Sequence, residues 1–439
     1  MIHTQLFSFA DGLSLLFWAI LLWLLGRTIK SKFSHLSLNR FFYAGWGFRI
    51  FFALVFALIY LYVLGGGDIN AYWDAATVLN KLFINDPMGY VQEMWSTDRT
   101  LGVTHHFTSA TGFPPGWIWR ELEAWNASKI LSVFSILTFN SFWATTVLIA
   151  SLVFFISWLL TIKIVEEIVF NKHAVVFAFL FFPSVTFWCS GISKDSQVYA
   201  LALLLIYQLF LWLKWGKRSI VRVLFILLNF YILFNLRHFI AIAVITPFVL
   251  AMAVRFGNRW SNKPIILSLF RMGLYSVVII GFIFLSNLDQ TQALIKEAQI
   301  TQADFSQNPI YTGAKYEIDQ MDGSPTGLIQ AVPNAVFIAL YRPLITEPIG
   351  TNFFINQLES LMLIIFTVFF FLNRSLFVNL RYLFKNEFAL YALTFVLITA
   401  FMAGYTSILF GVLVRIRAIA LPFFFLILTM RKPKENAIT

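Results

Sequence analysis

Apolar runs of about twenty residues recur along this chain and constrain its fold more than any other feature. About 20 apolar residues are needed for a helix to cross the ~30 Å hydrocarbon core of a bilayer. Only 12% of the 439 residues are charged, whereas a soluble protein carries about 25%. The runs lack the alternation of barrel strands. We therefore expect an all-α polytopic membrane protein.

The runs predict about eleven transmembrane helices in a single transmembrane domain, residues 1–439. We expect two long outer loops that carry interfacial helices, at residues 65–140 and 287–352. The first contains several tryptophans, which favour the headgroup level: Trp95, Trp117, Trp119 and Trp125. The predicted spans lie near 7–26, 41–64, 141–161, 174–190, 197–213, 220–236, 238–254, 265–286, 353–372, 388–405 and 416–430.

The placement of charge fixes the expected topology. Loops rich in Lys and Arg stay in the cytoplasm, so the basic segment 27–40 is placed inside. Alternation from there puts 17 of the 21 acidic residues outside. The net charge of +11 then follows from topology, and we expect membrane lipids, but no nucleic acid, as partners. Because acids contribute little to insertion, the acidic outer face is information about function.

Three glycines and a carboxylate follow the run that ends at Leu64, in the sequence Gly65-Gly66-Gly67-Asp68. A carboxylate at the exit of a span can act as general base for an incoming hydroxyl, and glycines let the backbone approach a ligand closely. The alternatives are that Asp68 and Asp74 are solvated acids, or that Asp68 caps an interfacial helix. Six residues apart, the two would not share one helix face.

Several cations are expected on the same outer side, where they can bind a phosphate. Arg binds phosphate bidentately and Lys as a point charge. Ordinary alternatives are an ion pair at a tight turn or snorkelling to headgroups. The candidates are Lys194 with Asp195, Arg237 with His238, Arg342, Arg415 and Arg417.

The remaining polar candidates are two histidines and two acids. His105 and His106 are adjacent and have no Cys or spaced His partner, so acceptor contact or loop structure is favoured over a metal site. Glu347 and Glu359 are candidates for sugar hydroxyls, or else surface acids. No phosphate-binding or dinucleotide glycine pattern occurs, so no ATP, NAD or other cofactor is expected.

Four segments resemble parts of a known family. Gly-Gly-Asp followed by an aromatic residue resembles the first outer loop of GT-C superfamily glycosyltransferases, and the segment from Phe182 to Asp195 is similar to a segment of bacterial membrane proteins of that kind. Arg342-Pro343 and the stretch Leu413 to Arg417, followed by Pro422, resemble further parts. The match consists of short motifs scattered over most of the chain, and this chain has an extra span before the first outer loop.

The resemblance implies a glycosyltransferase of the bacterial cytoplasmic membrane with its active site facing the periplasm or cell exterior. It implies a polyprenyl-phosphate-linked sugar as donor, a glycan, lipid or protein as acceptor, and Asp68 as the base. The closest alternative is a polysaccharide polymerase or ligase that uses undecaprenyl-pyrophosphate glycans. From other classes, a lipid or glycan transporter would have broken spans in matching halves, and a membrane scaffold would not need the acidic outer loops.

Overall fold

The computed structural model describes the chain in twelve pieces, and its contacts divide the chain into two compact units. Unit 1 comprises Met1–Lys163, Phe179–Trp212 and Arg218–Ala241, and unit 2 comprises Ile164–Ala178, Leu213–Lys217 and Ile242–Thr439. The described residues are 7–96, 105–119, 121–167, 171–213, 219–260, 273, 289–308, 313–316, 322, 324–350, 353–372 and 376–430.

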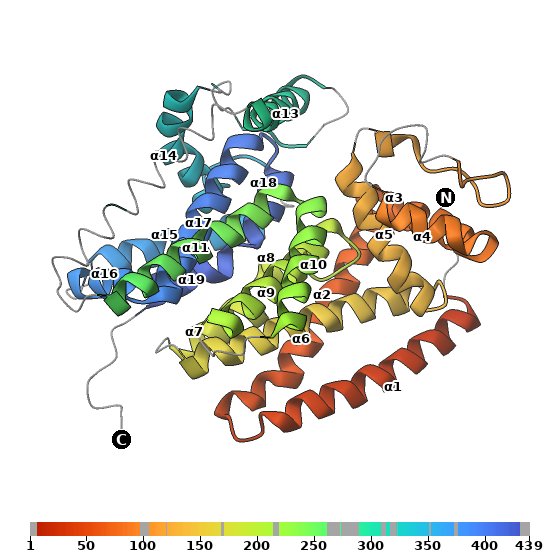
Figure 1. The fold of residues 1–439 in the computed structure, drawn as a ribbon, viewed down its shortest axis with the longest axis horizontal. Coiled ribbons are helices and arrows are strands. Elements are labelled where there is room, and N and C mark those ends of the chain that lie inside the picture. Colours follow the sequence, from red (N-terminus) through yellow and green to blue (C-terminus); the bar gives the residue numbers. More distant parts are fainter. Residues whose placement is uncertain are drawn as a thin grey trace. The chain divides into compact units, whose positions relative to one another are not determined.

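Within these residues the regular structure is helical (Figure 1), as the apolar runs predict. The first half of the chain forms α1 (Phe9–Lys32), α2 (Phe42–Leu58), α3 (Gly67–Asn85), α4 (Pro87–Trp95), α5 (Leu122–Leu137), α6 (Phe142–Glu167), α7 (Lys172–Val176), α8 (Pro183–Trp188) and α9 (Lys194–Leu213). The second half forms α10 (Ile220–Leu236), α11 (His238–Trp260), α13 (Asp289–Gln307), α14 (Pro325–Tyr341), α15 (Phe354–Leu372), α16 (Leu376–Lys385), α17 (Glu387–Thr406), α18 (Phe410–Ala418) and α19 (Leu421–Thr429).

Six of the described helices are long and apolar enough to cross a membrane. They are Phe9–Lys32, Ser37–Val63, Phe142–Glu166, Lys194–Trp212, Phe354–Leu372 and Glu387–Thr406. Shorter apolar helices occupy Lys172–Trp188, Ile220–Leu236 and His238–Met252, which overlap three further predicted spans. The predicted span 265–286 lies outside the described residues, apart from residue 273. Several membrane helices are therefore present, and the predicted number of eleven stays a prediction.

The last predicted span, 416–430, has different boundaries in the structure. The apolar segment begins at Phe410 and consists of α18 and α19, which bend by 63° at the break between Ala418 and Leu421. Pro422 lies in the first turn of α19, where proline is tolerated because its missing N–H would be unpaired there anyway. A continuous helix from 416 was therefore the wrong expectation.

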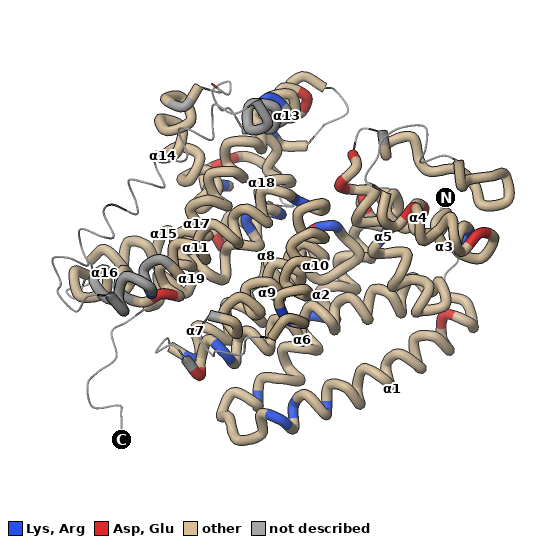
Figure 2. Tube along the Cα trace, viewed as in Figure 1, with Lys and Arg blue, Asp and Glu red and all other residues tan. Residues whose placement is uncertain are grey.

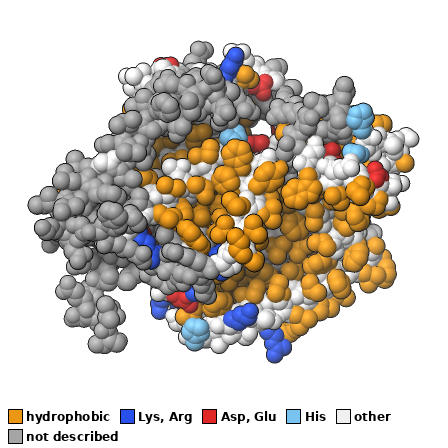
Figure 3. All heavy atoms as spheres, in the orientation of Figure 1, with side chains coloured by type: hydrophobic (Ala, Val, Ile, Leu, Met, Phe, Trp, Pro, Cys, Tyr) orange, Lys and Arg blue, Asp and Glu red, His pale blue; other side chains and the backbone are white. Residues whose placement is uncertain are grey.

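The exposed surface is apolar on helices that would face lipid. In α1 only Ser14, Leu22 and Gly26 are buried, and hydrophobic side chains gather over α1 and α10 (Figure 3). Along α1 the acid Asp11 lies in the first turn, and Lys30 and Lys32 lie in the last (Figure 2). This asymmetry fits a helix with a basic cytoplasmic end.

A buried arginine completes the core of unit 1. The Arg49 guanidinium, on α2, donates to the carbonyl oxygens of Phe179, Val185 and Cys189 at 3.0, 3.1 and 3.3 Å. These acceptors lie where the helical segment from Lys172 is interrupted by a π-helical turn at Phe177–Phe181 and by Pro183. Pro183 has no N–H to donate to the Phe179 carbonyl four residues earlier, and an unpaired carbonyl is costly in an apolar core. The Val185 carbonyl also accepts the Cys189 N–H at 3.1 Å, so Arg49 adds a second donor there. Arg49, an intramembrane charge of the kind that marks transport pathways, therefore has a structural role.

In unit 2, the helices α14 and α17 approach each other closely at Gly404. A Cβ placed on Gly404 would lie 1.9 Å from the Ala335 carbonyl oxygen, so only glycine allows the two backbones to approach this far. α14 continues through Pro333. The residue pair Gly404 and Ala335 thus sets the depth of packing between α14 and α17.

We predict that Gly404→Ala destabilises the protein because the added methyl group meets backbone, which cannot rotate away. Overpacking of this kind costs about 1–3 kcal/mol. The matched control is Gly47→Ala on α2, where an added Cβ meets nothing within 4 Å and alanine favours helix. Thermal unfolding in detergent, followed by size-exclusion fluorescence, should show a lower midpoint for Gly404→Ala alone. Equal midpoints for the two variants would contradict the prediction.

Candidate functional site

The glycine triplet before Asp68 forms a left-handed turn. Gly65, Gly66 and Gly67 have φ values of +70°, +112° and +55°, which side-chain-bearing residues adopt only with strain. The Gly66 N–H donates to the Tyr60 carbonyl oxygen at 2.6 Å, and a Cβ on Gly66 would lie 1.9 Å from the Asn70 amide nitrogen. The backbone path from α2 into α3 therefore explains the glycines without a ligand.

Asp68 lies in the first turn of α3, and the N-cap of that helix is Gly66. The expectation that Asp68 might itself be the cap is therefore wrong. Its side chain and that of Asp74 are half-buried. Six residues correspond to a rotation that leaves them about 120° apart around the helix, so the two carboxylates do not form a pair on one face. The turn presents Asp68 at the end of the candidate span Ser37–Val63.

The segment predicted as the first outer loop forms a packed helical layer with its own core. Leu79 of α3, Tyr90 of α4 and Trp125 of α5 belong to one buried cluster. The Trp125 indole N–H donates to Glu93 Oε1 at 2.8 Å, and the Lys129 ammonium lies 3.3 Å from the same oxygen. Trp125 is therefore a core residue, and its expected place at a membrane interface is corrected. Trp95 remains exposed.

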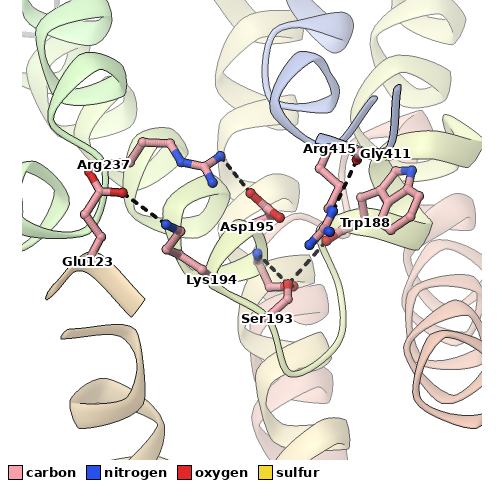
Figure 4. A network of polar contacts seen from close by, with 9 residues as sticks. Glu123, Trp188, Ser193, Lys194, Asp195, Arg237, Gly411 and Arg415 are labelled. Atoms are coloured by element: carbon pink, nitrogen blue, oxygen red, sulfur yellow. Dashed lines mark hydrogen bonds and ion pairs between the residues drawn. The ribbon is translucent and has the colours of Figure 1, made fainter. Parts of the chain in front are cut away.

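An ion cluster in unit 1 brings together four of the predicted site residues, and Figure 4 shows Lys194, Asp195 and Arg237. The Lys194 ammonium lies 3.0 Å from Glu123 Oε2, and His238 Nδ1 lies 3.1 Å from Glu123 Oε1. Beside them, Arg237 donates to Asp195 Oδ1 at 2.7 Å. Lys194 and Asp195 begin α9, and Arg237 and His238 form the junction of α10 and α11. Two tight turns and the start of α5 thus converge.

Glu123 joins the two basic groups of this cluster. Burial raises the pKa of its carboxyl, but the Lys194 ammonium, the hydrogen bond from His238 and the charge of Arg237 together lower it to about 2. Glu123 therefore stays ionised, and it holds His238 through Nδ1. The sequence did not single out Glu123. Its only signal was membership in the acidic outer loop.

Unit 2 pairs Arg342 with Glu347, which the sequence named separately. Arg342 Nε donates to Glu347 Oε1 at 2.5 Å, while Glu347 Oε2 accepts from the Leu344 N–H at 2.6 Å. The Arg342 guanidinium also lies 4.9 Å from the ring centre of Tyr316 and 5.3 Å from that of Phe410. Stacking on two rings orients the guanidinium, whose charge is paired with the Glu347 carboxylate in this structure.

Arg417 lies next to this pair and is itself almost fully buried, with 1% of its surface exposed. Its guanidinium donates to the Arg342 carbonyl oxygen and to Ser360 Oγ at 3.0 Å. Glu359, a predicted sugar ligand, is buried near enough to interact with its charge. Arg415, two residues earlier, is half-buried, and its Nε donates to the Gly411 carbonyl oxygen at 3.2 Å (Figure 4). Of the two, Arg415 is the better placed to bind a ligand.

The histidine pair and the cavity lie apart from these clusters. His105 is exposed and His106 half-buried in one turn, with His106 Nδ1 close to the α4 residue Gly89. Across the described ranges, no three His, Cys, Asp or Glu side chains form a group that could hold a metal ion. A cavity of about 470 Å³ in unit 2 is lined by Phe366, Phe370 and Met430 among others. Its lining includes none of the predicted site residues.

No family model, curated protein or solved structure matches this chain.

We predict that the stabilising effect of Glu123 depends on pH. Its folded-state pKa of about 2 lies below the ordinary value of 4.5, so its contribution is full above about pH 4.5 and is lost as the pH falls toward 2. In detergent, the midpoint difference between the wild type and Glu123→Gln should be large at pH 6 and clearly smaller at pH 3. A difference that does not change with pH would refute this role.

We predict that Arg417→Met destabilises unit 2 far more than Arg415→Met. The first change leaves buried acceptors without donors, which lowers the free energy of unfolding by roughly 1–3 kcal/mol for each group left unpaired. Arg415 is only half-buried, and its Nε donates to a carbonyl oxygen of its own helix. Folded yield and thermal midpoint in detergent measure the effect. Similar losses in both variants would show that Arg417 is not the structural member of the pair.

Proposed function

We propose that this protein is an integral membrane glycosyltransferase that transfers a sugar from a polyprenyl-phosphate carrier to an acceptor at the outer face of the bacterial cytoplasmic membrane. The observation that carries the proposal is the placement of Asp68, which is half-buried in the first turn of α3, directly after a candidate span. A carboxylate at this position can take the proton of an acceptor hydroxyl that approaches from the membrane boundary.

The cations of unit 2 support the donor half of the reaction. Arg342 is held between two aromatic rings, and Arg415 is half-buried in α18, within the bent pair of apolar helices. The Glu347 carboxylate accepts a hydrogen bond from the Arg342 guanidinium in this structure. A phosphate oxygen would accept the same hydrogen bond. When the sugar leaves, negative charge develops on the carrier phosphate, and guanidinium groups stabilise that charge. Nucleotide sugars are absent from the outer face, so the donor has to be membrane-borne.

The clusters of unit 1 support a place for the acceptor. His238 and Lys194 are partly exposed, with 30% and 16% of their side-chain surface accessible. Polar groups on several helix ends can bind the hydroxyls of a glycan. His105, His106 and Asp74 remain proposed contacts of the same kind, and the chemical identity of sugar and acceptor stays open between glycan, lipid and protein. A polymerase or ligase that uses pyrophosphate-linked glycans would employ the same groups.

A transporter is the second candidate, and one observation favours it. Apolar segments are interrupted at Phe177–Pro183 and at the α18–α19 bend, and broken helices near buried charges are typical of transport proteins. Arg49 and Arg417 satisfy carbonyl groups in the same units as these interruptions, which is a structural reason for the buried charges. We therefore place transport second.

We predict that Asp68→Asn lowers sugar transfer by about 10²–10⁴-fold, the usual loss when a general base is removed. The assay uses the purified protein in liposomes, with radiolabelled undecaprenyl-phosphate glucose, galactose, mannose and N-acetylglucosamine as donors and an envelope glycan extract as acceptor. Asp304→Asn on α13 is the isosteric control and should retain transfer.

The outcomes separate the candidates. Full transfer by Asp68→Asn would remove Asp68 as the base while leaving a glycosyltransferase. Movement of labelled carrier lipid between leaflets, with no new glycosidic bond formed by the wild type, would instead identify a transporter.

A further inference from the structure

The short helix α16 carries an apolar face that the rest of unit 2 leaves uncovered. Phe377 is 84% exposed, and Val378 and Phe384 are each 46% exposed. Asn379 and Leu383, on the other side of the helix, are buried. One side of α16 therefore packs on the protein, and another side exposes large hydrophobic side chains.

The position of α16 limits what can cover this face. It follows α15 and precedes α17, both of which are candidate spans, and it packs against both. Asn386 caps α17 immediately after α16. With 10 residues, α16 is about 15 Å long and cannot cross a bilayer. A short helix that joins the ends of two spans lies at one boundary of the membrane.

The helix α15, against which α16 packs, also has an exposed apolar surface. In its last turns, Phe369, Phe371 and Leu372 are 66%, 60% and 74% exposed, as expected for side chains among lipid acyl chains. α16 therefore lies beside a helix whose end would face lipid. A covering protein would have to compete with lipid at the edge of two spans.

The sequence around α16 has the charge of a membrane-surface segment. Residues 373–387 contain the basic residues Arg374, Arg381 and Lys385 and the single acid Glu387, which gives three positive and one negative charge, a net charge of +2. Basic residues beside an apolar stripe are typical of helices that lie in the headgroup region of an anionic leaflet.

We infer that α16 is an in-plane helix that binds the phospholipid bilayer, with Phe377 and Phe384 inserted among the acyl chains next to α15. This interaction surface is independent of the proposed enzymatic activity. It also fixes the level of the membrane relative to unit 2, because the α16 axis then marks the boundary between headgroups and acyl chains on that side.

Depth measurements by electron paramagnetic resonance test the inference. The protein has one cysteine, Cys189, which is buried, and a Cys189→Ala background removes it. Nitroxide labels are placed at Phe377→Cys or Phe384→Cys in liposomes of phosphatidylethanolamine and phosphatidylglycerol. Ile365→Cys, exposed in the middle of α15, is the lipid reference, and Ser34→Cys, exposed in the turn after α1, is the water reference.

We expect both α16 labels to collide more with oxygen than with a water-soluble nickel complex, at a depth between the two references. Accessibility to the nickel complex equal to that of Ser34→Cys would overturn the inference, because α16 would then lie in water. Inaccessibility to both reagents would also overturn it, because protein would then cover the helix. Two label sites keep the test decisive if one variant does not fold.

Discussion

The constraint on which this structure depends is that backbone carbonyl groups inside an apolar medium need donors. Helices satisfy it wherever they are continuous. Where the helical segments are interrupted, an arginine supplies donors instead, Arg49 to the segment Phe179–Cys189 in unit 1 and Arg417 to the Arg342 carbonyl in unit 2. A guanidinium suits this task because it offers five N–H donors in a fixed plane and keeps its charge. The interruptions in turn place polar residues close to helix ends, which is where the candidate site residues lie.

The same residues show how structural and chemical roles divide within one short motif. Arg415 and Arg417 are equivalent in sequence, since both lie among apolar residues near the end of the chain. The helix separates them, so that one is buried on carbonyl groups and the other is half-buried. Similarly, Asp195 is paired with Arg237 in the interior, while Lys194 and His238 share Glu123 near the surface. The Asp195–Arg237 pair is buried, whereas Lys194 and His238 are partly exposed, so Lys194 and His238 are the better candidates for binding a ligand.

Local patterns in the sequence predicted a helical membrane fold, because a run of apolar residues can be read without knowing its distant neighbours. They failed where distant residues decide the outcome. The bend between Ala418 and Leu421 interrupts a run that reads as continuous, and Trp125 is buried against Glu93 from a different helix. The sequence placed Lys194 with Asp195 and Arg237 with His238 in two separate turns, and it did not predict that these turns meet. Glu123, which joins Lys194 and His238, is one of many acids in its loop. The pairing of Arg342 with Glu347 across a five-residue turn is local, yet the stacking on Tyr316 and Phe410 is not.

The contacts of the two buried arginines also bear on how the protein is made. Chain synthesis proceeds from the N-terminus, and the acceptors of Arg49 lie 130 to 140 positions later in the chain. α2 is therefore delivered by the translocon with an unmatched cation in it, which has to stay near the channel or water until α8 emerges. Arg417 reverses the order, because Arg342, Asn356 and Ser360 all precede it. Insertion of α2 is thus the step at which a chaperone, or a delay in the release of this helix into lipid, matters most.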